Sequence, residues 1–526
     1  MREERYSVIG KPVPRVDGII KTKGEAMYTT DLSLPGMLYG KILRSPYPHA
    51  KIIRIDTSKA EKVRGVKAVI TGKDAPNIKY GCLMFDYPEA ADQYLLARDK
   101  VCYIGDAVGA VAALDEDIAT EALDRIVVEY EELPSVFSIE EATKPDAILI
   151  HEGSPGNISM MVASDFGDVE KGFLEADYIR EDRFITQLVQ HCCLEPQVCL
   201  ANFESTGKLT LWSSTQAVFL QRMLLARVLG MPDGMVRVIK PHMGGGFGEK
   251  AELFPLHLCT ALLSKKSGRP VKICHTREEE FAASSSRHPM MIELKIGVKK
   301  DGAITSRLAR VVLDGGAYNS LGPLAAYHSV MWLSLPYKQP NIKFESIRVY
   351  TNRSSSGALR GFTAPQIHFA TEVQMDMVAE ELGMDPLDLR IKNGLKAGDV
   401  TASGLRMTSG GLEACIQRVA EKSEWRKRYK KLPPLRGIGI GCDAFCSGSR
   451  VSIFGPSTAL ATILIKANID GTVTVNTGAA DVGQGSDTVV CQIAAEELGI
   501  RVEDIRIMTP DTDLSPPDYY TASSRV

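Results

Sequence analysis

The most constraining feature of the sequence is a glycine-rich segment that lies between two apolar runs. Residues Pro241–Glu252 read Pro-His-Met-Gly-Gly-Gly-Phe-Gly-Glu-Lys-Ala-Glu, after the β-branched run Met235–Ile239 and before the apolar run Leu253–Leu263. This order predicts a strand, a glycine turn and the start of a helix. The glycines can adopt backbone angles that other residues avoid, so successive N–H groups can converge on an anion near the positive end of the helix. The glycines alone are equally compatible with an ordinary tight turn.

The familiar nucleotide-binding patterns do not fit this segment. A Walker loop has its lysine directly after glycine and before serine or threonine, whereas Lys250 lies between Glu249 and Ala251. The segment does not match the dinucleotide-binding motif G-x-G-x-x-G either. As charged residues at the expected helix start, Glu249 and Glu252 are predicted to be partners of the helix dipole rather than general bases.

Composition excludes several classes of function. The chain of 526 residues has a net charge of -3, so it lacks the positive surface that nucleic acid or an anionic membrane requires. No run approaches the roughly 18 apolar residues of a membrane span and the N-terminus has no signal-peptide core, so we expect a cytoplasmic protein. The 11 cysteines show no zinc or iron–sulfur spacing. Any iron–sulfur centre is therefore expected on another chain.

Alternating strand and helix patterns divide the chain into three regions. Residues 14–145 predict a small α+β domain, and residues 146–400 predict a larger α+β region. The linker Lys427–Arg436, rich in lysine, arginine and proline, precedes a third region that extends to residue 526.

Local signals predict individual elements within these regions. Lys300-Asp-Gly302 predicts a hairpin turn between two strands. The pattern over Phe369–Leu382 predicts an amphipathic helix that ends at Gly383, and Asp385-Pro386 predicts the capped start of the next helix. Strands are also predicted over Lys208–Trp212, Met291–Val298, Gly437–Ile440 and Ala459–Lys466.

The third region repeats the strand, turn and helix pattern of the second. A strand over Thr472–Asn476 precedes the turn Asp481–Gly485, and the helix Ser486–Leu498 follows it. Two half-sites built alike suggest one extended ligand held between the two regions. Each contains a glutamine, Gln216 and Gln484, whose carboxamide can donate to and accept from a ligand with oxo and N–H groups. A plain turn followed by a capped helix is the alternative for the second half-site.

Taken together, these residues resemble the molybdenum-cofactor subunit of the xanthine dehydrogenase and aldehyde oxidase family. The N-terminal third looks closest to the 4-hydroxybenzoyl-CoA reductase branch. The resemblance implies an α+β fold, with an N-terminal hammerhead domain (14–145) followed by two related mixed α/β cofactor-binding domains (146–400 and 427–526), the last incomplete. The matching segments run along the whole chain in family order: Pro14–Gly18 with Thr29–Asp31, Gly244–Lys250, Asp314–Tyr318, Gly357–Phe362 with Pro365 and Gln366, Glu380–Lys392 and Asp481–Gly485.

The resemblance also implies roles for individual residues. Gln216 is expected to hydrogen-bond an oxo ligand of molybdenum, and Phe247 and Arg360 are expected to lie around the metal and pterin, none of them bonding the metal directly. Gln216 and Arg360 are the expected catalytic residues, although a structural arginine is an alternative for Arg360. Phe362 and His328 are expected to contact the substrate. The full set expected to bind the cofactor is Gln216, Gly246, Phe247, Gly248, Arg360, Gly483, Gln484, Gly485 and Ser523.

Positions at which this sequence departs from the family pattern reduce the range of expected substrates. Ala251 stands where purine-oxidising members carry a glutamate, and His328 stands where they use an arginine. Xanthine is therefore a poor fit. Gly361 replaces the cysteine that carbon monoxide dehydrogenases place beside their metal, so that branch is also disfavoured.

The expected activity is hydroxylation with oxygen from water, or another oxidation, of an aromatic, heteroaromatic or aldehyde substrate. A molybdenum–molybdopterin cofactor, with its cytosine dinucleotide form favoured, is expected to pass electrons to partner subunits that carry [2Fe-2S] and FAD. Reductive dehydroxylation of an aryl-CoA thioester is one alternative, and a non-catalytic cofactor-binding fragment is another.

The resemblance also bears on the C-terminal part of the subunit. Relatives continue beyond the position that matches Ser523 and supply a glutamate general base there. We therefore expect either one half of a split subunit, completed by a separate chain, or a truncated product that is inactive and marginally stable alone.

Overall fold

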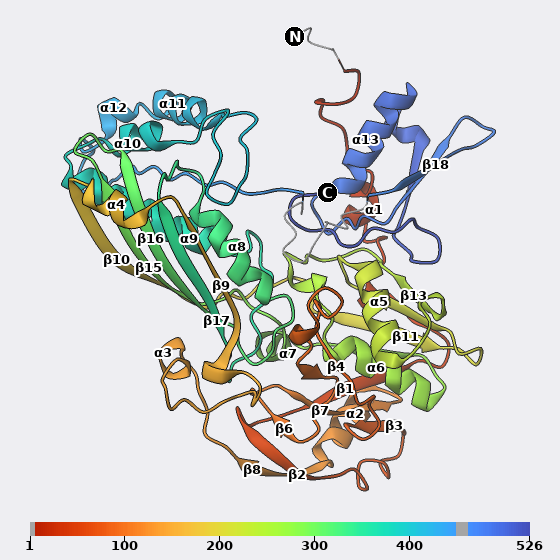
Figure 1. Ribbon diagram of the computed structural model, residues 1–526. Coiled ribbons are helices and arrows are strands. Elements are labelled where there is room, and N and C mark those ends of the chain that lie inside the picture. Colours follow the sequence, from red (N-terminus) through yellow and green to blue (C-terminus); the bar gives the residue numbers. More distant parts are fainter. Residues whose placement is uncertain (1–5, 449–460) are drawn as a thin grey trace.

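A computed structural model describes residues 6–448 and 461–526 (Figure 1). Its largest sheet has seven strands and joins the first and second regions of the sequence. Strand β1 pairs in parallel with β14, so the sheet continues across the boundary predicted near residue 146. The strands, in spatial order, are β13 (Val236–Ile239), β12 (Leu209–Ser213), β11 (Val198–Phe203), β14 (Val271–Cys274), β1 (Leu38–Arg44), β7 (Ala107–Ala113) and β3 (Val66–Thr71).

Helices cover both faces of this sheet because its central strands are apolar on both sides. Ile70 and Ala110 pack toward α6 (Pro255–Ser267) in the main core, which also contains residues of α5 (Val218–Leu229). Val69 and Val111 pack in a second cluster with α2 (Glu116–Asp124). Alternate side chains of a strand point to opposite faces, which explains this division. The sheet therefore forms a fixed platform for the turns that leave its edge.

A second sheet of five strands stands beside the first, on the left of Figure 1. One face packs against α8 (Pro323–Leu333) and α9 (Ala364–Glu381) in a separate core. The short helix α4 (Val169–Leu174) contacts β15 and β16. The strands, in spatial order, are β10 (Tyr178–Thr186), β15 (Met290–Val298), β16 (Ile304–Asp314), β17 (Ile342–Val349) and β9 (Ile158–Phe166).

Within residues 461–526, the third region forms a small unit of three strands and one α-helix. Strands β18 (Ile463–Ala467), β19 (Val473–Thr477) and β20 (Ile505–Met508) form its sheet, and α13 (Ser486–Leu498) packs on β20. An N-terminal segment docks onto this unit, because the Glu496 carboxylate accepts the backbone N–H groups of Ser7, Val8 and Ile9. Residues 7–9 thus lie on the third region rather than on the first.

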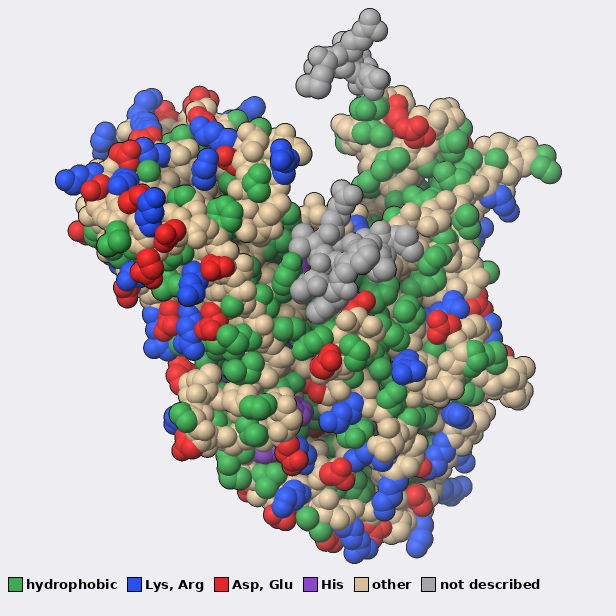
Figure 2. All heavy atoms as spheres, viewed as in Figure 1, with side chains coloured by type: hydrophobic (Ala, Val, Ile, Leu, Met, Phe, Trp, Pro, Cys, Tyr) green, Lys and Arg blue, Asp and Glu red, His purple; other side chains and the backbone are tan. Residues whose placement is uncertain are grey.

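The remaining elements complete two lobes and the base of the molecule. Helices α10 (Pro386–Asn393), α11 (Leu412–Lys422) and α12 (Trp425–Arg428) form the lobe above the second sheet, and α13 with β18 forms the other. The surface between the two lobes is hollowed (Figure 2). The short elements are α1 (Gly18–Thr22), α3 (Ile139–Ala142), α7 (Arg277–Ala283), β2 (Ala50–Asp56), β4 (Lys79–Tyr80), β5 (Gln93–Tyr94), β6 (Lys100–Val101) and β8 (Val127–Glu132).

Most of the predicted elements are present, with small shifts at their ends. The hairpin turn Lys300–Gly302 joins β15 to β16, the Asp385 side chain caps α10, and α13 has the predicted bounds. The predicted strand over Gly437–Ile440 is wrong, since these residues have irregular backbone. The strand predicted over Ala459–Lys466 begins outside the described residues. Among the described residues, no helix combines the length and apolarity that crossing a bilayer requires.

Candidate functional site

The glycine turn is enclosed by two other segments of the chain. Gly248 donates its N–H to Oε1 of Gln216 at 3.1 Å, and Arg360 donates its backbone N–H to the carbonyl oxygen of Phe247 at 2.8 Å. A Cβ on Gly248 would lie 2.4 Å from the carbonyl oxygen of Ala358, and its φ is +114°. Only glycine fits at this position. The segment that carries Arg360 is therefore pressed directly onto the turn.

The turn does not lead directly into an α-helix as the sequence predicts. A 3-10 helix of three residues, Glu249–Ala251, follows Gly248, and α6 begins only at Pro255. Lys250 is buried and donates to the carboxylate of Glu195 at 3.0 Å, so it is not available to an anion. Glu249 begins the 3-10 helix and Glu252 follows it, so neither acid lies at the start of α6 as the sequence predicts, and both are buried.

One residue near the end of the described chain joins the two half-sites. The carbonyl oxygen of Thr521 accepts from Nε2 of Gln216 at 2.8 Å, and its N–H donates to the backbone oxygen of Gln216 at 2.8 Å. Oγ1 of Thr521 accepts from the N–H of Ala480 at 2.8 Å. Nε2 of Gln484 in turn donates to the carbonyl oxygen of Ala480 at 3.1 Å. Gln216 and Gln484 are thus linked through a short chain of hydrogen bonds, although they lie in different regions.

Two cationic side chains strengthen the link between the two half-sites. Neither of them was expected to do so from the sequence. Lys240, at the end of β13, is buried and donates to the carbonyl oxygen of Asp481 at 2.8 Å. Its burial lowers the pKa of its ammonium group, and the charges of Asp487 and Asp481 oppose that shift. Arg15 donates to the carbonyl oxygen of Gly483 at 2.9 Å. Lys240 lies directly after a predicted strand and before the glycine segment, and this position in the sequence could have indicated its role.

The second glycine turn has the backbone geometry that requires glycine. Gly483 has φ +115° and Gly485 has φ +88°. The carboxamide of exposed Gln484 folds back on its own turn, where Oε1 accepts from the N–H of Val482 at 2.7 Å. Ser523 also has a left-handed φ of +53°, and its carbonyl oxygen accepts from the N–H of Gly448 at 2.9 Å.

Four of the residues assigned to this site or next to them have strained backbone. Phe247, Phe362, Thr363 and Ser523 are not glycine and have φ values of +52°, +37°, +73° and +53°. Such conformations cost about 1–3 kcal/mol each and persist only where the surroundings hold them. Strained backbone of this kind is often found at binding and catalytic sites, although residues elsewhere in the described chain, such as Asn157 and Glu424, also have positive φ.

The predicted substrate contacts lie against the same segment. Phe362 follows Arg360 by two residues, and its ring meets the ring of His328 edge to face with centroids 5.2 Å apart. The exposed guanidinium of Arg360 has no hydrogen-bond or ion-pair partner among the described residues. Gly246, Phe247, Gly248 and Arg360 are therefore gathered at one place, with Phe362 and His328 beside them. Trp332 stacks on the ring of His328 and donates to the carbonyl oxygen of Phe362, and it was missed because its apolar helix reads as ordinary core.

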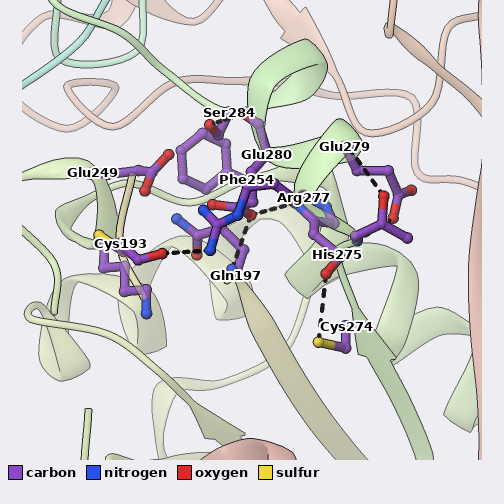
Figure 3. Close-up of polar contacts among 12 residues, drawn as sticks. Cys193, Gln197, Glu249, Phe254, Cys274, His275, Arg277, Glu279, Glu280 and Ser284 are labelled. Atoms are coloured by element: carbon purple, nitrogen blue, oxygen red, sulfur yellow. Dashed lines mark hydrogen bonds and ion pairs between the residues drawn. The ribbon is translucent and has the colours of Figure 1, made fainter. Parts of the chain in front are cut away.

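A cluster of buried acids lies behind the glycine turn (Figure 3). Glu280 lies between Glu249 on one side and His275 on the other, and Nδ1 of His275 is 2.9 Å from its Oε1. Burial, reinforced by the charge of Glu280, raises the pKa of Glu249 to about 8. Against the effect of burial, the hydrogen bond and charge of His275 lower the pKa of Glu280. One acid of the cluster is thus held neutral near pH 7 while its neighbour is ionised.

The types of polar group around the turns bear on the kind of ligand that they suit. Among residues 6–448 and 461–526, no group of three or more His, Cys, Asp or Glu side chains is arranged to hold a metal ion. The polar groups near the turns are carboxamides, a guanidinium and backbone N–H groups, which suit an extended ligand rich in oxygen atoms.

Comparison with known protein families places three matches along the chain. The model for the aldehyde oxidase and xanthine dehydrogenase a/b hammerhead domain matches residues 23–134. Models for the molybdopterin cofactor-binding domain match residues 150–394 and 417–526.

Individual relatives agree with these matches. A probable xanthine dehydrogenase subunit of Bacillus subtilis is 39% identical over 98% of this chain and 68% of its own length. The nicotinate dehydrogenase large molybdopterin subunit of Eubacterium barkeri is 37% identical over 81% of this chain and 99% of its own length. The solved aldehyde oxidoreductase from Desulfovibrio gigas superposes with a TM-score of 0.90 at 30% identity, covering 97% of this chain. This chain spans 57% of that solved chain.

Proposed function

Because the chain belongs to the xanthine dehydrogenase and aldehyde oxidase family of molybdenum-cofactor-binding large subunits, we propose that it is the catalytic subunit of a molybdenum-dependent oxidoreductase. Its substrate is an aromatic, heteroaromatic or aldehyde compound. The observation that carries the proposal is the meeting of Gln216 and the Gln484 turn on Thr521. Two glycine turns from different regions are thereby linked by hydrogen bonds, and the first of them is covered by the segment that carries Arg360.

The residues at this surface fit a molybdopterin cofactor. The guanidinium of Arg360 is exposed and suits a phosphate or another oxyanion, since it presents a planar fork of donors. The left-handed glycines Gly248, Gly483 and Gly485 let backbone approach a ligand closely. Phe247, Gly246 and Ser523 complete the set that we assign to cofactor binding. We assign none of these side chains as a direct ligand of the metal.

The roles of single residues follow from their hydrogen-bonding capacity. The Gln216 carboxamide has two N–H donors, and one of them is engaged by Thr521. The second can donate to an oxo group. Oε1 of the same side chain holds Gly248, which fixes the orientation of the amide. The cofactor, when bound, supplies the two-electron oxidation–reduction chemistry, while Gln216 and Arg360 orient and stabilise its oxygen atoms.

Further parts of the proposal concern partners, cofactor form and location. We assign iron–sulfur and flavin groups to partner subunits, since the described cysteines form no cluster that could hold iron. We favour the cytosine dinucleotide form of the cofactor and a cytoplasmic complex. The hammerhead domain is assigned to residues 14–145 and the cofactor-binding domains to residues 146–400 and 427–526.

Metal and nucleotide analysis tests the proposal. The complex that contains this chain is purified, and its molybdenum is measured by mass spectrometry together with fluorescent pterin after oxidation. Acid hydrolysis should release cytidine monophosphate. The chromophores of the partners should bleach when an aromatic or aldehyde substrate is added without an electron acceptor. A complex without molybdenum and pterin contradicts the proposal, and a loaded complex that no substrate or reductant affects supports a non-catalytic cofactor-binding fragment.

A further inference from the structure

A cavity of about 380 Å³ lies beside the large sheet, at the ends of two helices. Helix α5 begins two residues after Gln216 and ends at Leu229, and α6 begins after the glycine turn and carries Lys265 in its last turn. Leu229 and Lys265 both line the cavity. A helix rises about 1.5 Å per residue, so the cavity lies roughly 15–20 Å along these helices from the glycine turn. It is therefore separate from the proposed cofactor site.

Three side chains give the cavity apolar walls that are not fully covered by protein. Phe203 is the last residue of β11, Leu229 ends α5, and Leu262 lies in the C-terminal half of α6. All three pack at the edge of the main core and remain partly exposed. The cavity falls within the range of about 300–1,000 Å³ that is usual for small-molecule sites. Exposed apolar walls of this kind favour a ligand with a compact hydrophobic body.

Two lysines and one acid also line the cavity, and one of the lysines is unpaired. Nζ of Lys266 donates to the carboxylate of Asp74 at 2.7 Å and to the carbonyl oxygen of Val69 at 2.7 Å. Nζ of Lys265 lies 5.3 Å from the centroid of the Phe203 ring, and Lys265 has no ion-pair or hydrogen-bond partner among the described residues. Because Lys266 and Asp74 offset each other, the cavity retains one positive charge.

The position of Lys265 distinguishes it from an ordinary lysine at a helix end. Cations in the last turn of a helix often serve only the negative end of the helix dipole. The ammonium group of Lys265 instead lies over Phe203, which is a wall of the cavity and belongs to a different element. Its charge is therefore held at the cavity, where a bound anion can reach it.

We propose that this cavity binds a small aromatic monocarboxylate, whose carboxylate pairs with Lys265. The aromatic body displaces water from Phe203, Leu229 and Leu262, and the carboxylate meets the one unpaired charge. A neutral aromatic compound lacks the second interaction, and a free phosphate lacks the first. The inference goes beyond the proposed function, because it concerns a second site and does not depend on the cofactor.

Two probes of equal shape test the proposal on the purified complex. The probe 2-naphthoate carries a carboxylate where 2-naphthamide carries a neutral amide, and the two molecules are otherwise alike. Equilibrium dialysis at low ionic strength should show that naphthoate binds about fivefold more tightly, because only its charge pairs with Lys265. Added salt should reduce this difference, since Lys265 is exposed to solvent.

Matched variants assign the preference to Lys265 and the binding to this cavity. In Lys265→Met the two probes should bind equally, because methionine keeps an apolar side chain and removes the charge. Leu262→Trp should weaken the binding of both probes, because the indole occupies the cavity. Lys300→Met is the control, since Lys300 is exposed in the hairpin between β15 and β16, and it should leave the preference for naphthoate unchanged.

Hydrogen exchange separates this cavity from the proposed cofactor site. Naphthoate should slow the exchange of amide groups at the ends of α5 and α6 in the wild type, and this protection should be lost in Lys265→Met at the same probe concentration. Three results would overturn the inference. They are equal affinity of the wild type for the two probes, an unchanged preference in a Lys265→Met variant that folds by circular dichroism, and protection confined to the glycine turn. None of these measurements depends on molybdenum or turnover, so their failure is distinct from failure of the proposed function.

Discussion

Gln216 shows how much of the candidate site depends on single side chains. Its carboxamide contacts Gly248 at one end and Thr521 at the other, so it connects the first glycine turn to a segment 305 residues away. An alanine at this position would remove both hydrogen bonds and a proposed donor to an oxo group. The buried polar groups of Gly248 and Thr521 would then need other partners.

We predict that Gln216→Ala lowers turnover about a hundredfold or more while molybdenum remains bound. Loss of one oriented donor to a developing negative charge costs about 2.7–4 kcal/mol of barrier. Turnover and metal content are measured on the same preparation. The exposed residue Gln417 on α11 provides a control, since Gln417→Ala removes a carboxamide far from the turns. Wild-type turnover in fully loaded Gln216→Ala would remove Gln216 from the proposed catalytic set.

Glu249 makes the stability of the protein depend on pH in a definite direction. Its pKa of about 8 in the folded protein exceeds the ordinary value of about 4.5, so the folded state binds a proton that the unfolded state releases. The stabilisation is complete below about pH 4.5 and is lost as the pH rises to about 8. Between these two pH values, the free energy of unfolding falls by up to about 1.4 kcal/mol per pH unit, which is the value for one proton.

We therefore predict that Glu249→Gln is more stable than the wild type at pH 8 and that this advantage shrinks toward pH 5. Glutamine mimics the protonated carboxyl group and cannot ionise beside Glu280. Urea unfolding at several pH values measures the difference. Glu278→Gln on α7 is the control, because Glu278 is a first-turn acid on a short helix and its pKa is lowered rather than raised. Parallel pH profiles for wild type and Glu249→Gln would contradict this prediction.

At the scale of elements, structure that depends on local sequence signals was predicted, whereas structure that depends on long-range packing was not. The capped start of α10, the hairpin between β15 and β16, and all of α13 follow from short sequence patterns that act within a few residues. The glycine turn was recognised in the same way. Its continuation was not, because the conformation of Glu249–Ala251 depends on burial against other segments rather than on its neighbours in sequence.

We predict that Gly248→Ala destabilises the turn far more than left-handed backbone alone explains. The added methyl group would lie 2.4 Å from the carbonyl oxygen of Ala358, so the covering segment must move. The midpoint temperature of thermal unfolding and the molybdenum content should both fall. Gly230→Ala is a matched control, because Gly230 also has a positive φ, of +66°, but has no atom within 4 Å of the added position. That control should cost only about 1 kcal/mol. Equal losses in the two variants would show that the contact with Ala358 is unimportant.

At the scale of the whole molecule, the second and third regions are joined by many hydrogen bonds and several ion pairs, of which two illustrate the effect of burial. Lys240 bonds the carbonyl oxygen of Asp481, and Arg237 forms an ion pair with Asp511 at 2.6 Å. Lys240 is enclosed, whereas Arg237 is partly exposed and its pair is weakened by solvent. The buried lysine is therefore the stronger connection between the two half-sites.

We predict that Lys240→Met loosens the third region while the large sheet stays folded. Methionine keeps much of the side-chain length but removes the donors to Asp481. Hydrogen exchange should increase in the Asp481–Gly485 turn and in α13, with little change in β11. Lys266→Met is the control, because Lys266 is partly exposed and bonds the carbonyl oxygen of Val69 in the large sheet. Unchanged exchange in α13 would show that other contacts suffice to hold the two regions together.

The sequence by itself determined the class of the fold, its family, both glycine turns and most of the individual helices and strands that it predicts. These follow from signals that are local: periodicity, caps, hairpin turns and short motifs read in order along the chain. The same signals located Gln216, Phe247, Arg360 and Gln484 as residues of interest, and their proposed roles stay predictions.

Only the tertiary structure decided how these pieces meet. The pairing of β1 with β14, the docking of Ser7–Ile9 on Glu496, and the bond from Gln216 to Thr521 join residues far apart in sequence. Such contacts form because burial and hydrogen bonding are satisfied over the whole fold at once, and no short pattern encodes the partner. The tautomer of His328 is also decided by the tertiary structure, because the carbonyl oxygen of Leu324 lies within hydrogen-bond distance of Nδ1 and can only accept.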